Sequence, residues 1–149
     1  MAAGTLTVRI NVTGAKETLR AFRELPKEAN NALRDRSRGL SQDLAGRIRA
    51  AATADSAQSA LLARTVRARR DRVPVVVAGG TRRVGRKRKP AYKILFGSEF
   101  GATALKQYRP HVGRGSYWFF ITVERNEKRV ISAWRLMAED VIRAWSSDG

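Results

Sequence analysis

The stretch from Lys27 to Ala52 carries the pattern that most limits how this chain can fold. Apolar side chains return every three or four residues along it, at Ala29, Leu33, Leu40, Leu44 and Ile48. Arginines fill many positions between them, and Pro26 stands just before the first turn, where proline is well tolerated. This spacing predicts a long amphipathic helix, which has to bury its apolar stripe against a core.

The C-terminal part of the chain carries a second helical pattern. Apolar residues step through it by three or four positions, at Val130, Trp134, Met137, Val141 and Trp145. Ile131, Ala138 and Ile142 widen the stripe. The pattern predicts a closing helix over residues 131–145 that buries one face.

The N-terminal residues indicate a strand followed by a short helical segment. Residues 6–12 alternate apolar and polar side chains, which is the period of a strand with one buried face. Thr13-Gly14 then forms a turn with a possible N-cap, and Leu19, Phe22 and Leu25 follow at helical spacing until Pro26. Small and polar residues crowd positions 53–60 and predict a break after the long helix.

Two more strands are predicted in the middle of the chain. Strands are predicted over residues 61–70, which contain the β-branched Thr65 and Val66, and over residues 73–78, which contain four valines, with Asp71-Arg72 as the turn between them. Pro74 lies near the start of the second strand, which favours an edge position because proline lacks a backbone N–H. A short helical turn is predicted over residues 92–96, ending at Gly97.

An aromatic cluster, Tyr117-Trp118-Phe119-Phe120, lies within residues 116–123. If this segment is a strand, neighbouring rings point to opposite faces, and both faces need a partner. We therefore expect these four rings, together with Trp134 and Trp145, to lie in the core or in a subunit interface.

These elements predict an α+β fold. A small antiparallel sheet is packed by the long helix of the N-terminal half and by the C-terminal helix, in a single domain over residues 1–149. The length of 149 residues suits one domain, and the absence of cysteine excludes disulfide scaffolds and cysteine-ligated metal sites. No apolar run approaches the roughly 20 residues of a membrane span, and Met1–Gly4 lacks a signal-peptide layout, so we expect synthesis in a cytoplasm.

The charge of the chain is strongly positive and unevenly distributed. Thirty Lys+Arg residues stand against 13 Asp+Glu, a net charge of +17. Residues 54–91 hold 11 basic and 2 acidic residues, so +9 of this charge lies in one segment. We expect residues 79–91 to form a mobile basic loop, because like charges repel and Gly and Pro interrupt any apolar period. Its cations are Arg82, Arg83, Arg86, Lys87, Arg88 and Lys89.

This basic loop leaves three interpretations open. It is a solvated loop, a contact to nucleic-acid phosphates, or a docking arm for an acidic protein. Aromatic residues do not interleave with the cations, as they do on a stacking platform for single strands.

Catalytic and metal-binding patterns are missing from the sequence. His111 is the one histidine, so a zinc site here would need carboxylates as all its other ligands. Glu139 and Asp140 are neighbours on a predicted helix and point to different sides, which does not suit a carboxylate pair. Nucleophile elbows and phosphate-binding glycine loops are absent. We expect no enzyme, no cofactor, no metal and no small-molecule substrate.

Two segments in the N-terminal half resemble the tail-completion, or neck, proteins of long-tailed double-stranded DNA phages. The first is the strand and turn from Val8 to Gly14. The second runs from Leu19 to Glu28 into the Ala- and Arg-rich helix.

The second half of the chain strengthens the resemblance. That family carries an aromatic-aliphatic turn ending in Glu-Phe-Gly, matched here by residues 94–101 with Glu99, Phe100 and Gly101. An aromatic strand leading to Thr-Val and a closing helix follow, matched by residues 117–124 and 131–145. Ile121 stands where many members have proline.

The resemblance implies a small α+β virion protein without enzymatic activity. Such proteins form a ring homo-oligomer at the head–tail junction, here expected to be a hexamer. The ring contacts head-side connector or stopper proteins and tail-tube or terminator proteins, and it lines the DNA ejection path. Contact with genomic double-stranded DNA is possible there, and Glu99-Phe100-Gly101 sets a turn. The alternative is a sequence-nonspecific nucleic-acid-binding protein that uses residues 81–89.

Overall fold

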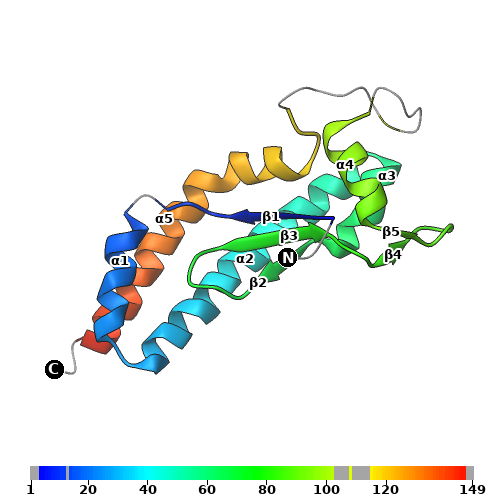
Figure 1. The fold of residues 1–149 in the computed structure, drawn as a ribbon. Helices are drawn as coiled ribbons and strands as arrows, with labels where there is room; N and C mark the ends of the chain where they lie inside the picture. Colours follow the sequence, from blue (N-terminus) through cyan, green and yellow to red (C-terminus); the bar gives the residue numbers. More distant parts are fainter. Residues whose placement is uncertain (1–3, 13, 103–107, 109–114, 147–149) are drawn as a thin grey trace.

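The computed structural model describes residues 4–12, 14–102, 108 and 115–146. It confirms the predicted α+β class: a three-stranded antiparallel sheet is packed by two long helices, α2 (Lys27–Asp55) and α5 (Phe119–Ser146). Helix α2 packs against α5 and also against two strands of the sheet, so it forms the centre of the fold (Figure 1). Both helices are longer than predicted: α2 continues to Asp55, and α5 begins at Phe119.

The N-terminal segment follows the prediction closely. Strand β1 (Thr5–Arg9) is followed by helix α1 (Ala15–Ala21) and the 3-10 helix η1 (Phe22–Glu24). Gly14 is the N-cap of α1, with a positive φ of 82°, and Thr13 lies outside the described residues. Pro26 ends this segment and is the N-cap of α2.

The sheet has the order β1–β3–β2, and β3 (Val75–Gly79) is its central strand. Thr5 of β1 lies opposite Gly79, and Arg67 of β2 (Arg67–Arg69) lies opposite Val77. The edge position predicted from Pro74 is therefore wrong. Proline is tolerated because it precedes the strand, where its carbonyl accepts a hydrogen bond from the Ile10 N–H at 2.9 Å.

Residues 61–70 were expected to form one strand, and most of them are helical. Helix α3 (Ala57–Leu62) and the 3-10 helix η2 (Ala63–Thr65) precede the three residues of β2. A capping box starts α3: the Ser56 side chain accepts from the Ser59 N–H, and the Ser59 side chain accepts from the Ser56 N–H. Local capping and burial of Leu62 favour the helix, and only Thr65 and Val66 of residues 61–70 are β-branched.

The break predicted over residues 53–60 is correspondingly narrow. Helix α2 continues to Asp55, and only Ser56, which is extended, separates it from α3.

The helix predicted to stop at Gly97 continues to Phe100 as α4 (Tyr92–Phe100). A Cβ atom on Gly97 would lie only 2.6 Å from the ring of Tyr108. Glycine is present at this position because a ring packs directly on the helix, and the helix itself ends at Gly101, whose φ is 79°.

Residues 116–123 do not form the expected strand. Helix α5 begins at Phe119, and residues 115–118 approach it without regular structure. Two of the aromatic rings, Trp118 and Phe119, are fully buried, whereas Tyr117 and Phe120 pack against the core while partly exposed. The rings therefore cluster around a helix start rather than on two faces of a sheet.

The basic segment forms a short hairpin. Strand β4 (Arg83–Val84) pairs with β5 (Lys89–Pro90), with Arg83 opposite Pro90. Gly85 and Arg88 both have positive φ in the turn between them. Figure 1 shows this hairpin beside α3 and α4, at the opposite end of the molecule from α1.

Trp134 joins α5 to α2 and to the loop before β3. Its indole N–H donates to the Arg72 carbonyl at 2.7 Å and lies 3.1 Å from the Ser37 hydroxyl, which itself donates to the same carbonyl. Trp134 is fully buried, as predicted for the core, and Trp145 packs partly buried near the C-terminal end of α5. Among the described residues, no helix is long and apolar enough to cross a membrane.

Candidate functional site

Glu99 is a fully buried carboxylate at the end of α4, and it holds the start of α5. Its Oε1 accepts hydrogen bonds from the Trp118 N–H at 3.0 Å, the Phe119 N–H at 2.8 Å and the Ser116 hydroxyl at 2.8 Å. Its Oε2 accepts from the Phe120 N–H at 2.7 Å. We call this arrangement the Glu99 junction.

The Glu99 junction provides hydrogen-bond acceptors for the first N–H groups of α5. The first N–H groups of a helix lack carbonyl partners within the helix and carry partial positive charge. A carboxylate in this position satisfies several of them at once and is favoured by the helix dipole. Ser116 completes the cap, since its hydroxyl oxygen accepts from the Ile121 N–H at 3.1 Å. Residues 98–101 and 116–121 are thereby joined into one unit.

A chain of aromatic rings lies along the same junction. Phe100 stacks between Phe96 and Phe120, with ring centroids 6.4 Å and 5.9 Å apart. Phe119 meets Phe120 and Trp118 edge to face, at 5.3 Å and 5.7 Å. The Trp118 indole N–H donates to the Ser98 hydroxyl at 3.3 Å. The predicted aromatics Trp118, Phe119 and Phe120 thus pack onto the helix that carries Glu99.

The structure gives the three residues of the Glu-Phe-Gly motif different positions. Glu99 and Phe100 are the last two residues of α4, and Gly101 is its C-cap. The anchoring role of Glu99 was missed in the sequence, because its partners lie 17 to 21 residues further along the chain. The sequence signal that could have indicated this role is the position of Glu99, which is the one carboxylate in the largely apolar and aromatic segment 94–101.

A second feature is an open basic cleft that runs from the end of β3 along the α3–η2 segment to the β4–β5 hairpin. Two adjoining hollows form it, the first of about 450 Å³, and they share Arg64 and Arg82. Six arginines line this basic cleft: Arg64, Arg67, Arg82, Arg83, Arg86 and Arg88. No Asp or Glu is among the residues that line either hollow.

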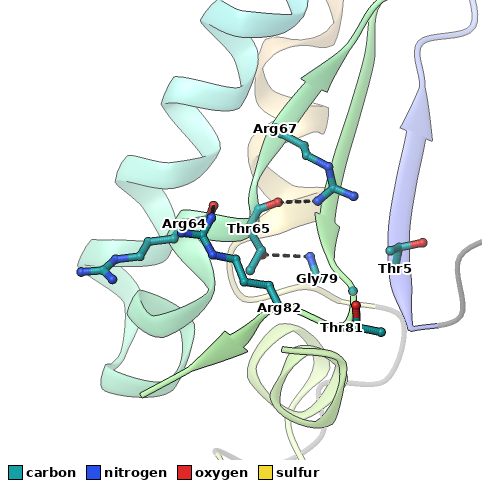
Figure 2. A pocket seen from close by; sticks show the side chains of 8 residues that line it. Thr5, Arg64, Thr65, Arg67, Gly79, Thr81 and Arg82 are labelled. Carbon is teal, nitrogen blue, oxygen red and sulfur yellow. Dashed lines mark hydrogen bonds between the residues drawn. The ribbon is translucent and has the colours of Figure 1, made fainter. Parts of the chain in front are cut away.

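Three elements contribute arginines to the lining of the first hollow, and in Figure 2 the Arg64 side chain extends away from Arg67. Arg64 comes from η2, Arg67 from β2, and Arg82 from the link between β3 and β4. The Arg67 guanidinium donates to the Thr65 carbonyl at 3.0 Å, and the Arg82 guanidinium donates to the Arg64 carbonyl at 3.1 Å. Arg83 donates in the same way to the Arg88 carbonyl at 2.7 Å.

The floor of the first hollow is the end of β3. Gly79 and Gly80 have φ values of 92° and 99°. A Cβ atom on Gly79 would lie 2.5 Å from Leu95 and 2.7 Å from the Gly4 carbonyl, so only glycine fits there. The Gly79 N–H donates to the Thr65 hydroxyl at 2.9 Å, which ties η2 to the sheet.

The predicted basic residues fall into two groups. Arg82, Arg83, Arg86 and Arg88 line the basic cleft, whereas Lys87 and Lys89 line a neighbouring hollow together with Lys93. Arg64 and Arg67 were missed, because their segment was predicted to be a strand separated from the loop by another strand. Only the packing of α3–η2 beside the hairpin brings them to the same surface.

Several arginines outside the cleft are paired with carboxylates. Arg9 contacts Asp71 at 2.8 Å, and Arg70 contacts Asp35 at 2.7 Å. Asp43 accepts from Arg129 of α5 at 2.9 Å and from Arg47 at 3.3 Å. The hydrogen bond from Arg129 is the largest cause of a lowered pKa at Asp43, and Arg47 lowers this pKa further.

The described residues contain no cluster of three or more metal-ligating side chains. His111 lies outside the residues that the structure describes. No family model matches this chain, and neither a curated protein nor a solved structure matches it.

Proposed function

We propose that this chain is a structural protein of the phage head–tail junction, acting in the virion without enzymatic activity. It assembles as a ring, expected to be a hexamer, that joins the head connector or stopper to the tail tube or terminator. It is made in the cytoplasm of the bacterial host.

The Glu99 junction is the observation that carries this proposal. The resemblance in the second half of the chain rests on two separate segments, residues 94–101 and 117–124. Atoms of both segments meet directly at the Glu99 carboxylate. The two segments therefore form one structural unit in this chain, which the proposed role requires.

Isoleucine at position 121, where many members of the family have proline, is compatible with the structural unit formed by residues 94–101 and 117–124. Ile121 lies in the first turn of α5, the part of a helix that accepts proline most readily. A proline here in other members would leave the helix in place, although it would lose the N–H that Ile121 donates to Ser116.

Ring assembly needs two different surface patches on each subunit, because closed rings of identical copies form by head-to-tail contacts. The outer edge of β1 and the exposed side of α2 are such a pair. Strand β1 is at the edge of the sheet, and α2 exposes Asp35, Arg36 and Arg38 on the side that faces away from the core.

The decisive experiment uses a phage that encodes this chain. An amber codon at Lys27 is expected to yield filled heads and separate tails in a non-suppressing host, as seen by negative-stain electron microscopy. Growth in a suppressing host should restore joined virions. Joined, infectious virions that lack the protein would overturn the proposal.

A biophysical test complements this experiment. Sedimentation velocity and native mass spectrometry of the purified chain are expected to show a discrete ring. A strictly monomeric chain that is also absent from the neck of virions would contradict the proposed role.

A further inference from the structure

The basic cleft carries cationic charge that the described protein does not neutralise. The ion pairs of Arg9, Arg47, Arg70, Arg129 and Arg143 with carboxylates include no arginine of the cleft. A concave surface lined by charges of one sign concentrates the electrostatic field and attracts anions. The cleft is therefore suited to an anionic partner from outside the chain.

Hydrogen bonds to neutral groups orient three of the cleft arginines, so their positive charge is not neutralised by a carboxylate. Arg67, Arg82 and Arg83 each donate to a backbone carbonyl, which is neutral, rather than to a carboxylate. A guanidinium has five N–H donors in a planar fork, so one such bond leaves others for an external acceptor. Holding the side chains beforehand lowers the entropy lost when a ligand binds.

Arg88 has a backbone conformation that destabilises the turn between β4 and β5 when the residue carries a side chain. Its φ of 52° is the left-handed conformation, and its N–H donates to the Gly85 carbonyl at 3.2 Å. This conformation is unfavourable for a side chain such as arginine, whereas glycine and asparagine adopt it readily. Arginine therefore contributes charge to the cleft rather than stability to the hairpin.

The lining of the first hollow favours phosphate groups over a protein surface. It consists of threonine, glycine and arginine: Thr5, Arg64, Thr65, Arg67, Gly79, Gly80, Thr81 and Arg82. Protein interfaces are centred on apolar and aromatic anchors, which this hollow lacks. Arginine forks and hydroxyl groups are the usual ligands of backbone phosphates in nucleic acids.

The same lining favours a duplex over a single strand. Single-strand binding sites combine basic grooves with aromatic side chains on which bases stack. No aromatic residue is among those that line the two hollows of the cleft. Contact through phosphates alone does not require exposed bases.

We propose that the basic cleft binds the phosphate backbone of double-stranded DNA independently of sequence, with Arg64, Arg67 and Arg82 as its core. The inference rests on the charge and the lining of the cleft. It holds whether or not the chain acts at a head–tail junction.

Fluorescence anisotropy of a labelled 24-base-pair duplex tests the proposal over a series of NaCl concentrations. The cleft variant carries Arg64→Gln, Arg67→Gln and Arg82→Gln. The control variant carries Lys16→Gln, Arg20→Gln and Arg23→Gln, which are exposed in the α1–η1 segment away from the cleft. Both variants remove three positive charges.

We expect the wild type to bind the duplex with a steep salt dependence. Loss of three phosphate contacts should reduce the slope of log K against log salt by about 3 and weaken binding about 100-fold at 0.1 M salt. The control variant should retain the wild-type slope within about 1 and lose less than about 5-fold in affinity.

Two results on the duplex would overturn the proposal: no binding by the wild type at 0.1 M salt, or equal weakening of binding in the cleft and control variants. Two results with other ligands would also overturn it. These are tighter binding of a single-stranded oligonucleotide than of the duplex, and competition by polyglutamate as effective as competition by unlabelled duplex. Equal weakening would indicate diffuse attraction by net charge. Effective competition by polyglutamate would instead indicate a docking surface for an acidic protein. The amber-codon experiment is independent of all four results.

Arg88→Asn keeps the test valid if the triple variant fails to fold. Asparagine tolerates the left-handed turn, so the hairpin should be at least as stable as in the wild type. Duplex binding should nevertheless weaken and lose about one unit of salt slope. Unchanged binding by this variant would exclude Arg88 and argue against the cleft as the contact surface.

Discussion

At Glu99, one carboxylate meets four hydrogen-bond donors from a segment that lies 17 to 21 residues further along the chain. Hydrogen bonds to a charged group contribute about 1.5–3 kcal/mol each, more than bonds between neutral groups. The carboxylate also lies where the dipole of α5 favours negative charge. A single side chain therefore decides where a 28-residue helix begins and how α4 meets it.

Replacing Glu99 tests this role at the scale of one residue. Glu99→Gln removes the charge and turns an NH₂ group toward backbone N–H donors. We expect the free energy of unfolding, measured by urea titration at pH 7, to fall by about 2–4 kcal/mol. The matched control is Glu139→Gln, an exposed residue of α5, which should change it by less than about 0.5 kcal/mol. Equal stability of the two variants would contradict the assigned role.

The pairing of α2 with α5 is the main contact between elements in this fold. Apolar burial supplies most of it, with Leu33, Leu44 and Trp134 fully buried. Asp43 adds an electrostatic link at the surface, because it lies on α2 and accepts from Arg129 of α5. Both groups of this pair are about half exposed, so solvent screens the interaction.

The lowered pKa of Asp43 predicts how this link depends on pH. A carboxylate with a depressed native pKa stabilises the fold above its unfolded pKa, and this contribution is lost as pH falls through the native value. Asp43→Asn should therefore be less stable than the wild type by under about 1 kcal/mol at pH 7 in low salt. The difference should vanish well below pH 3.8, the ordinary value, and shrink in 0.5 M NaCl.

Urea titrations across this pH range provide the measurement for Asp43. Asp140→Asn is the control, since Asp140 pairs only with Arg143 of the same helix in the described structure. A difference between wild type and Asp43→Asn that grows as the pH falls would reverse the predicted sign.

For the whole molecule, the net charge of +17 makes self-repulsion the dominant long-range electrostatic effect. Salt screens this repulsion, and it also screens the ion pairs, which are exposed and contribute little. Repulsion should therefore outweigh pairing. We expect the Tm from calorimetry to rise by about 3–6 °C between 20 and 200 mM NaCl.

Neutralising the hairpin tests where this repulsion arises. A variant with Gln at Arg82, Arg83, Arg86, Lys87, Arg88 and Lys89 should show a smaller rise of Tm with salt than the wild type. The reason is that residues 54–91 hold +9 of the net charge. A Tm that falls with salt in the wild type would mean that ion pairs dominate instead.

Local periodicity was sufficient to predict the long helices and two of the strands. The stripe from Ala29 to Ile48 and the stripe from Val130 to Trp145 repeat at helical spacing, and most of their apolar residues are buried. Alternation near Leu6 likewise predicted β1. Periodicity is a property of neighbouring residues, so it can be read without knowing what the segment contacts.

The sequence by itself therefore determined the α+β class, the two helical stripes, and the concentration of charge in one segment. Only the tertiary structure decided that the aromatic run begins a helix and that Arg64 and Arg67 line the same hollow as Arg82. Both depend on groups far apart in the chain: Glu99 contacts Phe119, and Arg82 contacts Arg64. Long-range contacts leave no period in the sequence, and the energy of burying a carboxylate or gathering arginines is set by the partners that folding brings together.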